Sequence, residues 1–236
     1  MGDIDSARRL GDLVNEVPGS ARVFEQYQLD YCCGGGRRLD EACSELGLDA
    51  SAIVAELVAM EPAPEPDWAS MSPAQLVDHL EATHHRYLAD EFGRLGALAE
   101  KVAGVHGGRH PELLEVRATY DELRADLEPH LAKEERVLFP MIRELSGATV
   151  APSFHCGSLR NPVLQMLREH DRAGELLGRL RGLTADYRTP DDGCASFRSL
   201  YEGLAELESD THLHIHKENN LLFPAVLEME HRLAGA

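Results

Sequence analysis

The chain has 236 residues, enough for one large core or for a small and a larger domain, and its formal charge is −18 because 41 acidic residues outnumber 23 basic ones. This charge argues against nucleic acid and against an anionic membrane surface as partners. We expect no transmembrane helix, because no run of 18 apolar residues is present, and the N-terminus lacks the features of a signal peptide. Together with an odd number of cysteines, five, these features predict a cytoplasmic protein with free thiols.

Residues 1–61 are predicted to form a small helical module. Its glycine run, Cys32-Cys33-Gly34-Gly35-Gly36, does not hold a regular helix and therefore separates the second predicted helix from the third. The proline-rich segment 61–67 is predicted to be a stiff, solvated linker, and we place the domain boundary there. The four short helices are expected over 7–17, between Ser20 and Asp30, over 39–46 and over 52–60.

Residues 68–236 are predicted to form an antiparallel four-helix bundle, so the fold class is all-α. Pro73, Pro111 and Pro162 each stand at or near the start of a long helical pattern, where a missing N–H does no harm. Strand signals are almost absent, and short connections favour antiparallel neighbours. The segment 146–161 is longer than a minimal helix connection. It could cover a metal site, but we favour an ordinary connecting loop. The long helices are expected over 73–102, 111–145, 162–183 and 195–231.

A repeated motif carries most of the chemistry. Two eleven-residue stretches start at His130 and at His214, share six identical positions, and each contain His-x3-Glu followed by Leu-Phe-Pro. His85 and His170 precede these motifs by 45 and 44 residues. The pattern indicates a duplicated helical hairpin that supplies one histidine from its first helix and a His–Glu pair from its second.

Hydrophobic periodicity predicts that these polar groups point into the bundle. Apolar residues at steps of three and four run through both motifs, as far as Val137 and Met141 in one and Leu221 and Ala225 in the other. Such a stripe faces the bundle interior, and an i, i+4 His–Glu pair shares one helix face. Two carboxylates buried opposite each other would be very costly unless cations neutralised them.

The sequence therefore predicts a di-metal centre with two imidazoles on each ion, both carboxylates bridging, and an oxo or hydroxo bridge. Nitrogen and oxygen ligands without thiolate favour iron over manganese, and zinc more often takes fewer ligands, so we expect two non-haem iron ions. His84 is a secondary candidate, because Leu88 and Phe92 share a helix face with His85 instead. The six expected ligands are His85, His130, Glu134, His170, His214 and Glu218.

These motifs resemble the repair-of-iron-centres family of di-iron, hemerythrin-like proteins over nearly the whole chain. The resemblance rests on Tyr31 with its paired cysteines, on Glu169-His170-Asp171, and on the two His-x3-Glu motifs. It implies a role in restoring iron–sulfur clusters damaged by nitric oxide or oxidants, with the six residues above as ligands. It also implies damaged iron–sulfur proteins, nitric oxide or O2, and an electron donor as partners, and it makes His106 a further metal-site candidate.

The paired cysteines allow a functional and a structural interpretation. A disulfide between Cys32 and Cys33 would need a strained ring, and the following glycines leave the thiols exposed. Such thiols could carry electrons, hold iron transiently or take up a nitrosyl group; alternatively they are small hydrophobic residues in a turn. The resemblance favours function. The linker leaves open whether this module docks within one chain or across a homodimer.

The remaining histidines and cysteines are predicted to be structural or exposed. His212 and His216 lie two residues from His214, so they point away from its face and are expected at the surface. Cys43 and Cys194 are expected to pack between helices. Lys133 and Lys217, at matching positions of the two motifs, either set the charge of the site or only flank it.

Three functions are compatible with these residues, and whether the protein is an enzyme is left open. The first is cluster repair by a labile di-iron site that supplies iron. The second is an enzyme that reduces or transfers nitric oxide at two adjacent irons with open coordination positions. The third is a sensor that binds O2 or nitric oxide without losing iron.

Overall fold

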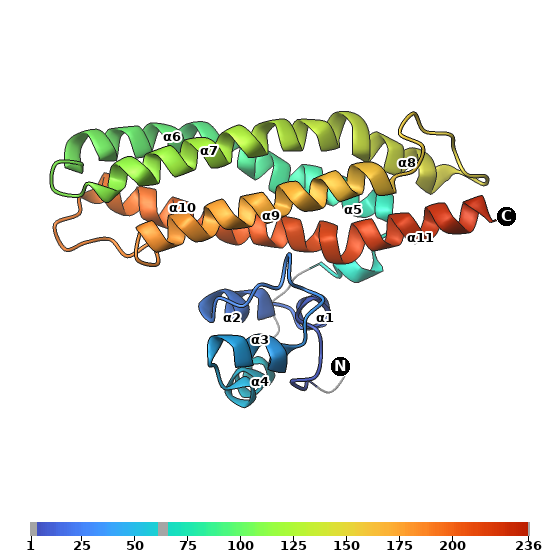
Figure 1. The fold of residues 1–236 in the computed structure, drawn as a ribbon, viewed down its shortest axis with the longest axis horizontal. Helices are drawn as coiled ribbons and strands as arrows, with labels where there is room; N and C mark the ends of the chain where they lie inside the picture. Colours follow the sequence, from blue (N-terminus) through green and yellow to red (C-terminus); the bar gives the residue numbers. More distant parts are fainter. Residues whose placement is uncertain (1–3, 61–65, 236) are drawn as a thin grey trace.

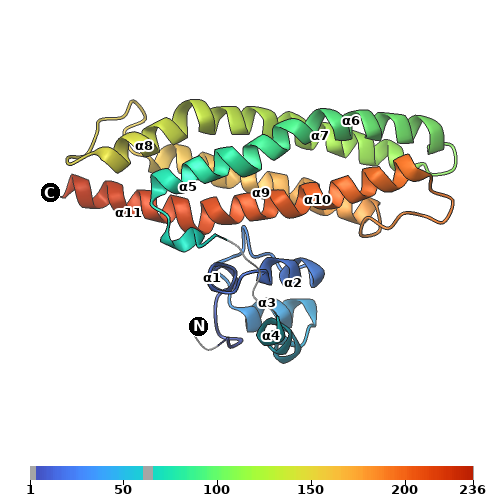
Figure 2. The same cartoon turned by 180° about the vertical axis from the view of Figure 1, so that it is seen from behind.

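The structure, a computed structural model, describes residues 4–60 and 66–235, and within these ranges it contains helices and no strand. Four long helical rods lie side by side, and a small helical unit lies against one side of them near the middle (Figure 1). The view from behind shows the same arrangement (Figure 2). The predicted all-α fold with a bundle and a small N-terminal unit is confirmed.

The four rods correspond to the four predicted segments and extend a few residues beyond them. Three of the rods each contain one five-residue π-helical turn, labelled η2, η3 and η4. The first rod is α5 (Pro73–Leu80), η2 (Glu81–His85) and α6 (Arg86–His106), and the second is α7 (Glu112–Lys133), η3 (Glu134–Leu138) and α8 (Phe139–Gly147). The third is α9 (Arg160–Leu183), and the fourth is α10 (Ala195–Lys217), η4 (Glu218–Leu222) and α11 (Phe223–Ala234).

The rods form a closed ring in chain order. Helix α7 packs against α6 and α9, and α10 packs against α6 and α9. Successive rods run in opposite directions (Figure 1). The first rod starts at a capping box in which the Ser72 hydroxyl accepts from the Gln75 N–H, while the Gln75 side chain accepts from the Ser72 N–H. The predicted loop between α8 and α9 contains no helix, and its Phe154 packs into the apolar core at that end.

The π-helical turns at η3 and η4 follow from the repeated Phe-Pro dipeptide. Proline has no N–H, and its ring clashes with the carbonyl four residues earlier, which disfavours a regular α-turn before Pro140 and Pro224. The preceding phenylalanine N–H instead bonds five residues back, to the carbonyl of Glu134 or of Glu218. Each widened turn inserts one residue, so the core-facing stripe moves on by one position.

This register shift corrects part of the predicted core. Val137 was expected to face the interior but is 40% exposed, and Leu138 is buried in its place. In the fourth rod Leu222 is fully buried, whereas Leu221 is only partly buried. The predicted steps of three and four hold up to Glu134 and Glu218. Beyond them Val137 and Leu221 lie off the core-facing stripe, whereas Met141 is buried as predicted.

The N-terminal module has four short helices and docks on the bundle. Its hydrophobic residues belong to the same apolar cluster as one half of the bundle core, so apolar packing continues from the module into the bundle. The predicted linker begins outside the described residues, since 61–65 are not among them. The helices are α1 (Leu10–Glu16), α2 (Ser20–Gln26), α3 (Leu39–Leu46) and α4 (Ala50–Ala59), and a short 3-10 turn, η1 (Trp68–Ser70), precedes the bundle.

Asn220 of η4 fixes the docking of the cysteine loop, residues 28–36. Its side-chain amide donates to the Cys32 carbonyl at 2.9 Å. Gly35 lies directly beneath it: a Cβ on Gly35 would come within 2.5 Å of the Asn220 Oδ1 and of the Tyr31 carbonyl oxygen. Only glycine therefore allows the loop to approach the bundle this closely.

We predict that Gly35→Ala lowers the free energy of unfolding by about 1–3 kcal/mol, because the methyl group overlaps backbone and Asn220 atoms in a packed interface. Gly36→Ala is the matched control, since a Cβ there meets nothing within 4 Å. Its effect is expected to stay within about 0.5 kcal/mol. Chemical denaturation of both variants measures this, and equal stabilities would contradict the proposed close contact.

Candidate metal centre

Six polar side chains form a buried layer across the middle of the bundle. The four histidines are at most 3% exposed, and the two glutamates are fully buried. The layer separates two apolar clusters, one shared with the N-terminal module and one at the end where α8 and α11 lie. Its members are His85 at the end of η2, His130 in α7, Glu134 in η3, His170 in α9, His214 in α10 and Glu218 in η4.

Each carboxylate lies between two histidines. The Glu134 Oε1 is 3.3 Å from the His130 Nε2, and its Oε2 is 3.5 Å from the His85 Nε2. The Glu218 Oε2 is 3.1 Å from the His170 Nε2, and its Oε1 is 3.5 Å from the His214 Nε2. The six residues thus form two groups of four, each with two histidines and both glutamates, whose ligand atoms lie within 4.8 Å of one another.

The inner atoms of this layer have the arrangement that two cations require. Both oxygens of Glu134 and of Glu218 are buried without a hydrogen-bond partner, as is the Nε2 of His214. Buried polar atoms without partners are rare in folded proteins, because each costs the free energy of its lost hydration. The His130 and His170 Nε2 atoms approach to 3.2 Å, which suits two ligands of one ion. The donor set therefore fits a di-metal centre.

Outer hydrogen bonds hold three of the histidines with Nε2 facing inward. The Nδ1–H of His130 donates to the Glu169 carboxylate at 2.8 Å. His85 donates in the same way to Glu135 at 3.0 Å. His170 donates to the side-chain oxygen of Asn219 at 2.8 Å. Such partners set the tautomer and ring orientation of metal-binding histidines.

The charges inside the layer compensate one another even without a metal. Burial alone would raise the pKa of Glu218, but the adjacent His214 and His170 lower it well below its usual value. Burial lowers the pKa of His214. Burial also opposes protonation of His130, yet Glu134, Glu169 and Glu218 together raise its pKa to about 10.

We predict that metal loading near pH 8 releases a proton from His130, since a ligating imidazole must be neutral and this one is protonated up to about pH 10 in the metal-free protein. Metal affinity therefore rises with pH across this range. The protonated histidine stabilises the metal-free fold fully below about pH 6.5, its unfolded value, and this contribution is lost as the pH rises through about 10.

Calorimetric titration of metal in two buffers with different ionisation enthalpies measures the protons released. Glu169→Gln is the control, because it removes a hydrogen-bonding carboxylate that raises the pKa of His130. The variant should release fewer protons at the same pH. Equal apparent enthalpies in both buffers for the wild type would contradict the prediction.

The two secondary candidates lie outside both four-residue groups of the described chain. His84 stacks on the His214 ring with centroids 5.5 Å apart, and its Nδ1–H donates to Asp210 at 2.8 Å. Burial and the adjacent Lys217 lower the pKa of His84 to about 2, so it stays neutral. His106 lies at the C-terminal end of α6, where its Nε2 is 3.2 Å from the Cys194 sulfur.

The surface prediction for the flanking histidines is wrong for His216. This residue is fully buried, donates from Nε2 to Asn15 at 2.8 Å, and faces the N-terminal module. His212 is partly buried on the same side. Both do point away from the face of His214, but docking of the module covers that opposite face of α10. The sequence pattern of α10 carries no signal for that docking.

The two lysines at matching positions have different surroundings. Lys217 is 3% exposed, with its ammonium 2.7 Å from the His84 Nε2 and 4.1 Å from the centre of the Trp68 ring. Lys133 is about half exposed and pairs with Glu169. Lys217 thus places a buried positive charge one residue from Glu218, whereas Lys133 acts at the surface.

The cysteine predictions are partly corrected. Cys43 packs in the core, as expected, but Cys194 is exposed in the connection before α10. Both thiols of the pair were expected to be exposed, yet Cys32 is 5% exposed and Cys33 is partly buried. Cys32 is covered because the loop that carries it is held against η4.

The role of Asn219 was not predicted from the sequence. Its side-chain oxygen accepts from the His170 Nδ1–H at 2.8 Å, and its amide nitrogen lies 3.5 Å from the Cys32 carbonyl. A single side chain thus contacts a candidate ligand and the cysteine loop. The sequence does contain a hint of this role, because the two repeated motifs differ here: Asn219-Asn220 stands where the first motif has Glu135-Arg136.

Fold and site define a hemerythrin-type bundle with a di-metal site of histidines and glutamates. The Hemerythrin HHE cation binding domain family matches residues 76–226, and the ScdA_N family, a domain of unknown function, matches residues 6–61. The chain belongs to the family of iron–sulfur cluster repair proteins related to YtfE.

Two relatives illustrate the extent of the similarity. The probable iron–sulfur cluster repair protein of Haemophilus influenzae is 35% identical over 224 residues, covering 93% of this chain and 96% of the relative. The iron–sulfur cluster repair protein YtfE of Edwardsiella ictaluri is 36% identical over 222 residues, with the same coverage of both chains. No helix in the described part of the chain is long and apolar enough to cross a membrane.

Proposed function

We propose that this protein repairs damaged iron–sulfur clusters by supplying iron from a di-iron centre bound by four histidines and two bridging glutamates. The observation that carries the proposal is the buried layer itself, in which four unpartnered carboxylate oxygens face histidine Nε2 atoms. Nitrogen and oxygen donors without thiolate suit iron. The repair role is supported by the names of the full-length relatives. The proposed ligands are His85, His130, Glu134, His170, His214 and Glu218.

A bound di-iron pair would supply open coordination positions and labile metal. The residues of the chain hold the site, orient it and connect it to solvent. Beside His130, a cavity of about 260 Å³ lined by Lys133 and Glu169 reaches the surface. The carboxylate that orients His130 is therefore itself accessible to solvent.

The clients in this proposal are damaged iron–sulfur proteins, and the compartment is the cytoplasm. The five cysteines within the described ranges are all free thiols, which supports a reducing environment. Two of them, Cys32 and Cys33, lie in a loop that Asn219 and Asn220 connect to the metal-binding rods. We assign these two thiols to the handling of iron.

An anaerobic transfer assay tests this function. Iron-loaded protein is mixed with a cluster-free ferredoxin, sulfide and a reductant, and recovery of the cluster absorption is followed. We expect recovery with the wild type and none with the Glu134→Ala plus Glu218→Ala variant. A ferrous chelator in solution, at a concentration that leaves the loaded protein intact, shows that the iron passes directly from protein to acceptor.

Two other measurements on the iron-loaded protein distinguish the enzyme and sensor functions from iron supply. Catalytic consumption of nitric oxide with a defined electron donor, without cluster recovery, would assign an enzyme that acts on nitric oxide. Binding of O2 or nitric oxide with full retention of iron, again without recovery, would assign a sensor. Either result would overturn the proposed iron supply.

A further inference from the structure

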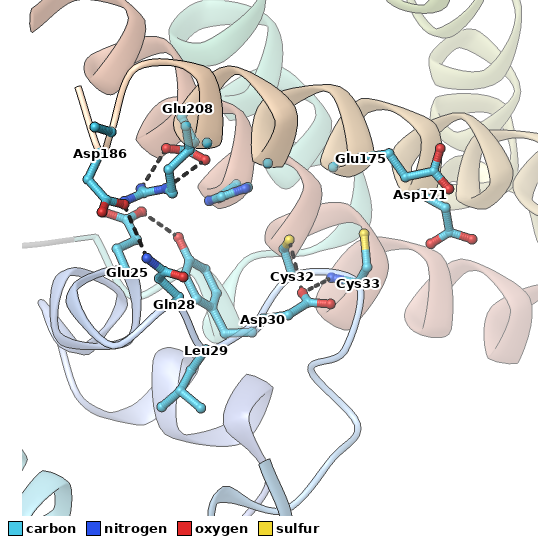
Figure 3. Close-up of a pocket in the computed structure, with 17 residues that line it drawn as sticks. Glu25, Gln28, Leu29, Asp30, Cys32, Cys33, Asp171, Glu175, Asp186 and Glu208 are labelled. Atoms are coloured by element: carbon cyan, nitrogen blue, oxygen red, sulfur yellow. Dashed lines mark hydrogen bonds and ion pairs between the residues drawn. The ribbon is translucent and has the colours of Figure 1, made fainter. Parts of the chain in front are cut away.

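A cavity of about 700 Å³ lies between the cysteine loop and the bundle. Its walls come from Glu25 and residues 28–33 on one side, and from α9, the turn after it and α10 on the other (Figure 3). Cys32 and Cys33 both place their sulfur atoms on the side of the loop that faces the bundle, and the Asp30 carboxylate lies beside them (Figure 3). The proposed di-iron ligands do not line this cavity.

Three side chains of the loop converge like the ligands of a metal ion. One ligand atom each from Asp30, Cys32 and Cys33 lies within 4.8 Å of the others. The Asp30 Oδ1 is 3.3 Å from the Cys32 sulfur and accepts the Cys33 N–H at 2.9 Å. Gly34 makes this possible, because a Cβ there would come within 2.9 Å of the Asp30 Oδ2. The carboxylate is thus held against the paired thiols by the loop itself.

The charge of the cavity selects a cation. Apart from the thiols and the Tyr31 phenol, its ionisable lining consists of carboxylates, the imidazole of His212 and the guanidinium of Arg181, which is already paired with Glu208. Such a wall repels anionic thiols and phosphates and raises the local concentration of divalent cations. The six lining carboxylates are Glu25, Asp30, Asp171, Glu175, Asp186 and Glu208.

The type of donor atom narrows the choice of cation. Two sulfur donors with one oxygen suit borderline and soft divalent ions such as Fe²⁺, Co²⁺ and Zn²⁺, and disfavour Mg²⁺ and Ca²⁺. Cys32 is nearly inaccessible, whereas Asp30 is exposed and Cys33 partly so. An ion bound there would have protein ligands on one side and an open side toward the cavity.

We propose that Asp30, Cys32 and Cys33 form a third, mononuclear metal site, which holds Fe²⁺ in transit between the di-metal centre and a client. The transit role rests on the proposed function, whereas the site itself does not. The Asn219 side chain contacts both His170 and the Cys32 carbonyl, so the loop is attached next to a candidate ligand of the centre. Iron leaving on this side meets the thiols before it reaches bulk solvent.

The transfer starts from the diferrous form of the centre and is a ligand exchange without electron transfer. As Fe²⁺ binds, the two thiols lose their protons to solvent and form two iron–sulfur bonds, and Asp30 adds one oxygen ligand. A client approaches the open side with neutral thiols, which lose their protons as they bind the ion, and takes the ion. Cys32 and Cys33 then regain two protons, and the iron is ferrous before and after.

Cobalt titration of the full-length protein tests the site directly. A histidine–carboxylate centre filled with Co²⁺ gives no thiolate-to-cobalt charge-transfer band, so this near-ultraviolet band reports the third ion alone. We expect about three cobalt ions per chain for the wild type, with the band growing as the last one binds. Saturation at two ions without the band would overturn the proposal.

Single substitutions test whether the thiolate-to-cobalt band arises from these three residues. Cys33→Ser, at a partly exposed position, should weaken the third site at least tenfold and reduce the band, and Asp30→Asn should weaken binding while keeping the band. Cys194→Ser is the matched control at an exposed cysteine and should change neither. A band that persists unchanged in Cys33→Ser, or that disappears in Cys194→Ser, contradicts the assignment.

The transit role has its own readout, separate from the repair function. In the ferredoxin assay, Cys33→Ser should slow iron delivery at least tenfold while its di-metal centre stays loaded. Unchanged delivery with the third site lost would overturn transit and leave the proposed function intact. No delivery from the wild type, together with an intact thiolate band, would overturn the proposed function and leave the third site standing.

Discussion

Replacing both Glu134 and Glu218 by alanine is expected to remove the two ions of the di-metal centre, because each carboxylate faces both proposed ions. The helical fold should persist, since the apolar clusters on both sides of the layer are unaffected. Anaerobic metal analysis and the absorption of an oxo-bridged iron pair measure the loss, and circular dichroism measures the fold.

Thermal stability gives an independent readout of the same variant. Metal at about 100 times its dissociation constant stabilises a protein that binds it only when folded by about 2.7 kcal/mol per site. The wild type should show this gain and the double variant should not. The control is Glu128→Ala plus Glu202→Ala, at exposed positions on α7 and α10. This variant should bind metal like the wild type and should be stabilised by it to the same extent. Iron retained unchanged by the Glu134 and Glu218 variant would disprove the bridging roles.

Asn219→Ala is expected to lower metal affinity by about 10–100-fold, the usual effect of removing an outer partner from a ligating histidine. The variant loses the oxygen that holds the His170 Nδ1–H at 2.8 Å, so the ring is free to rotate away from the centre. A competition titration against a chelator of known affinity measures the change.

Asn220→Ala is the matched control for this effect. Asn220 also donates to the Cys32 carbonyl, at 2.9 Å, but its contacts do not include His170. It should loosen the cysteine loop and leave the affinity of the di-metal centre within about threefold of wild type, because no candidate ligand loses its partner. Equal losses in both variants would show that docking of the module, rather than orientation of His170, sets the affinity.

The bundle and the convergence of the six polar residues could be predicted because both depend on local patterns. Helix period and start signals decide where long helices run, and His130 and Glu134 share a face through the geometry of one helix alone. The duplicated motif then implies pseudo-twofold symmetry, and the free energy of burying Glu134 opposite Glu218 implies cations. No knowledge of distant contacts is needed for these steps.

Only the tertiary structure revealed where the predicted spacing of core residues ends. The π-helical turns after Glu134 and Glu218 shift the core register, so Leu138 and Leu222 replace the predicted Val137 and Leu221. The Phe-Pro dipeptides were visible in the sequence, but a proline can also end or kink a helix, and the outcome depends on what packs around it.

The docking of the N-terminal module was likewise decided by tertiary structure. Residues of α10 that were predicted to lie at the surface, above all His216, are buried because the N-terminal module covers them. Asn219 reaches His170 and the Cys32 carbonyl from a single turn, contacts between residues far apart in the chain. The helices and the proposed metal ligands could be predicted from local spacing alone. The contact through Asn219 between the metal layer and the cysteine loop was decided by the folded chain, because it depends on the packing of two separate units.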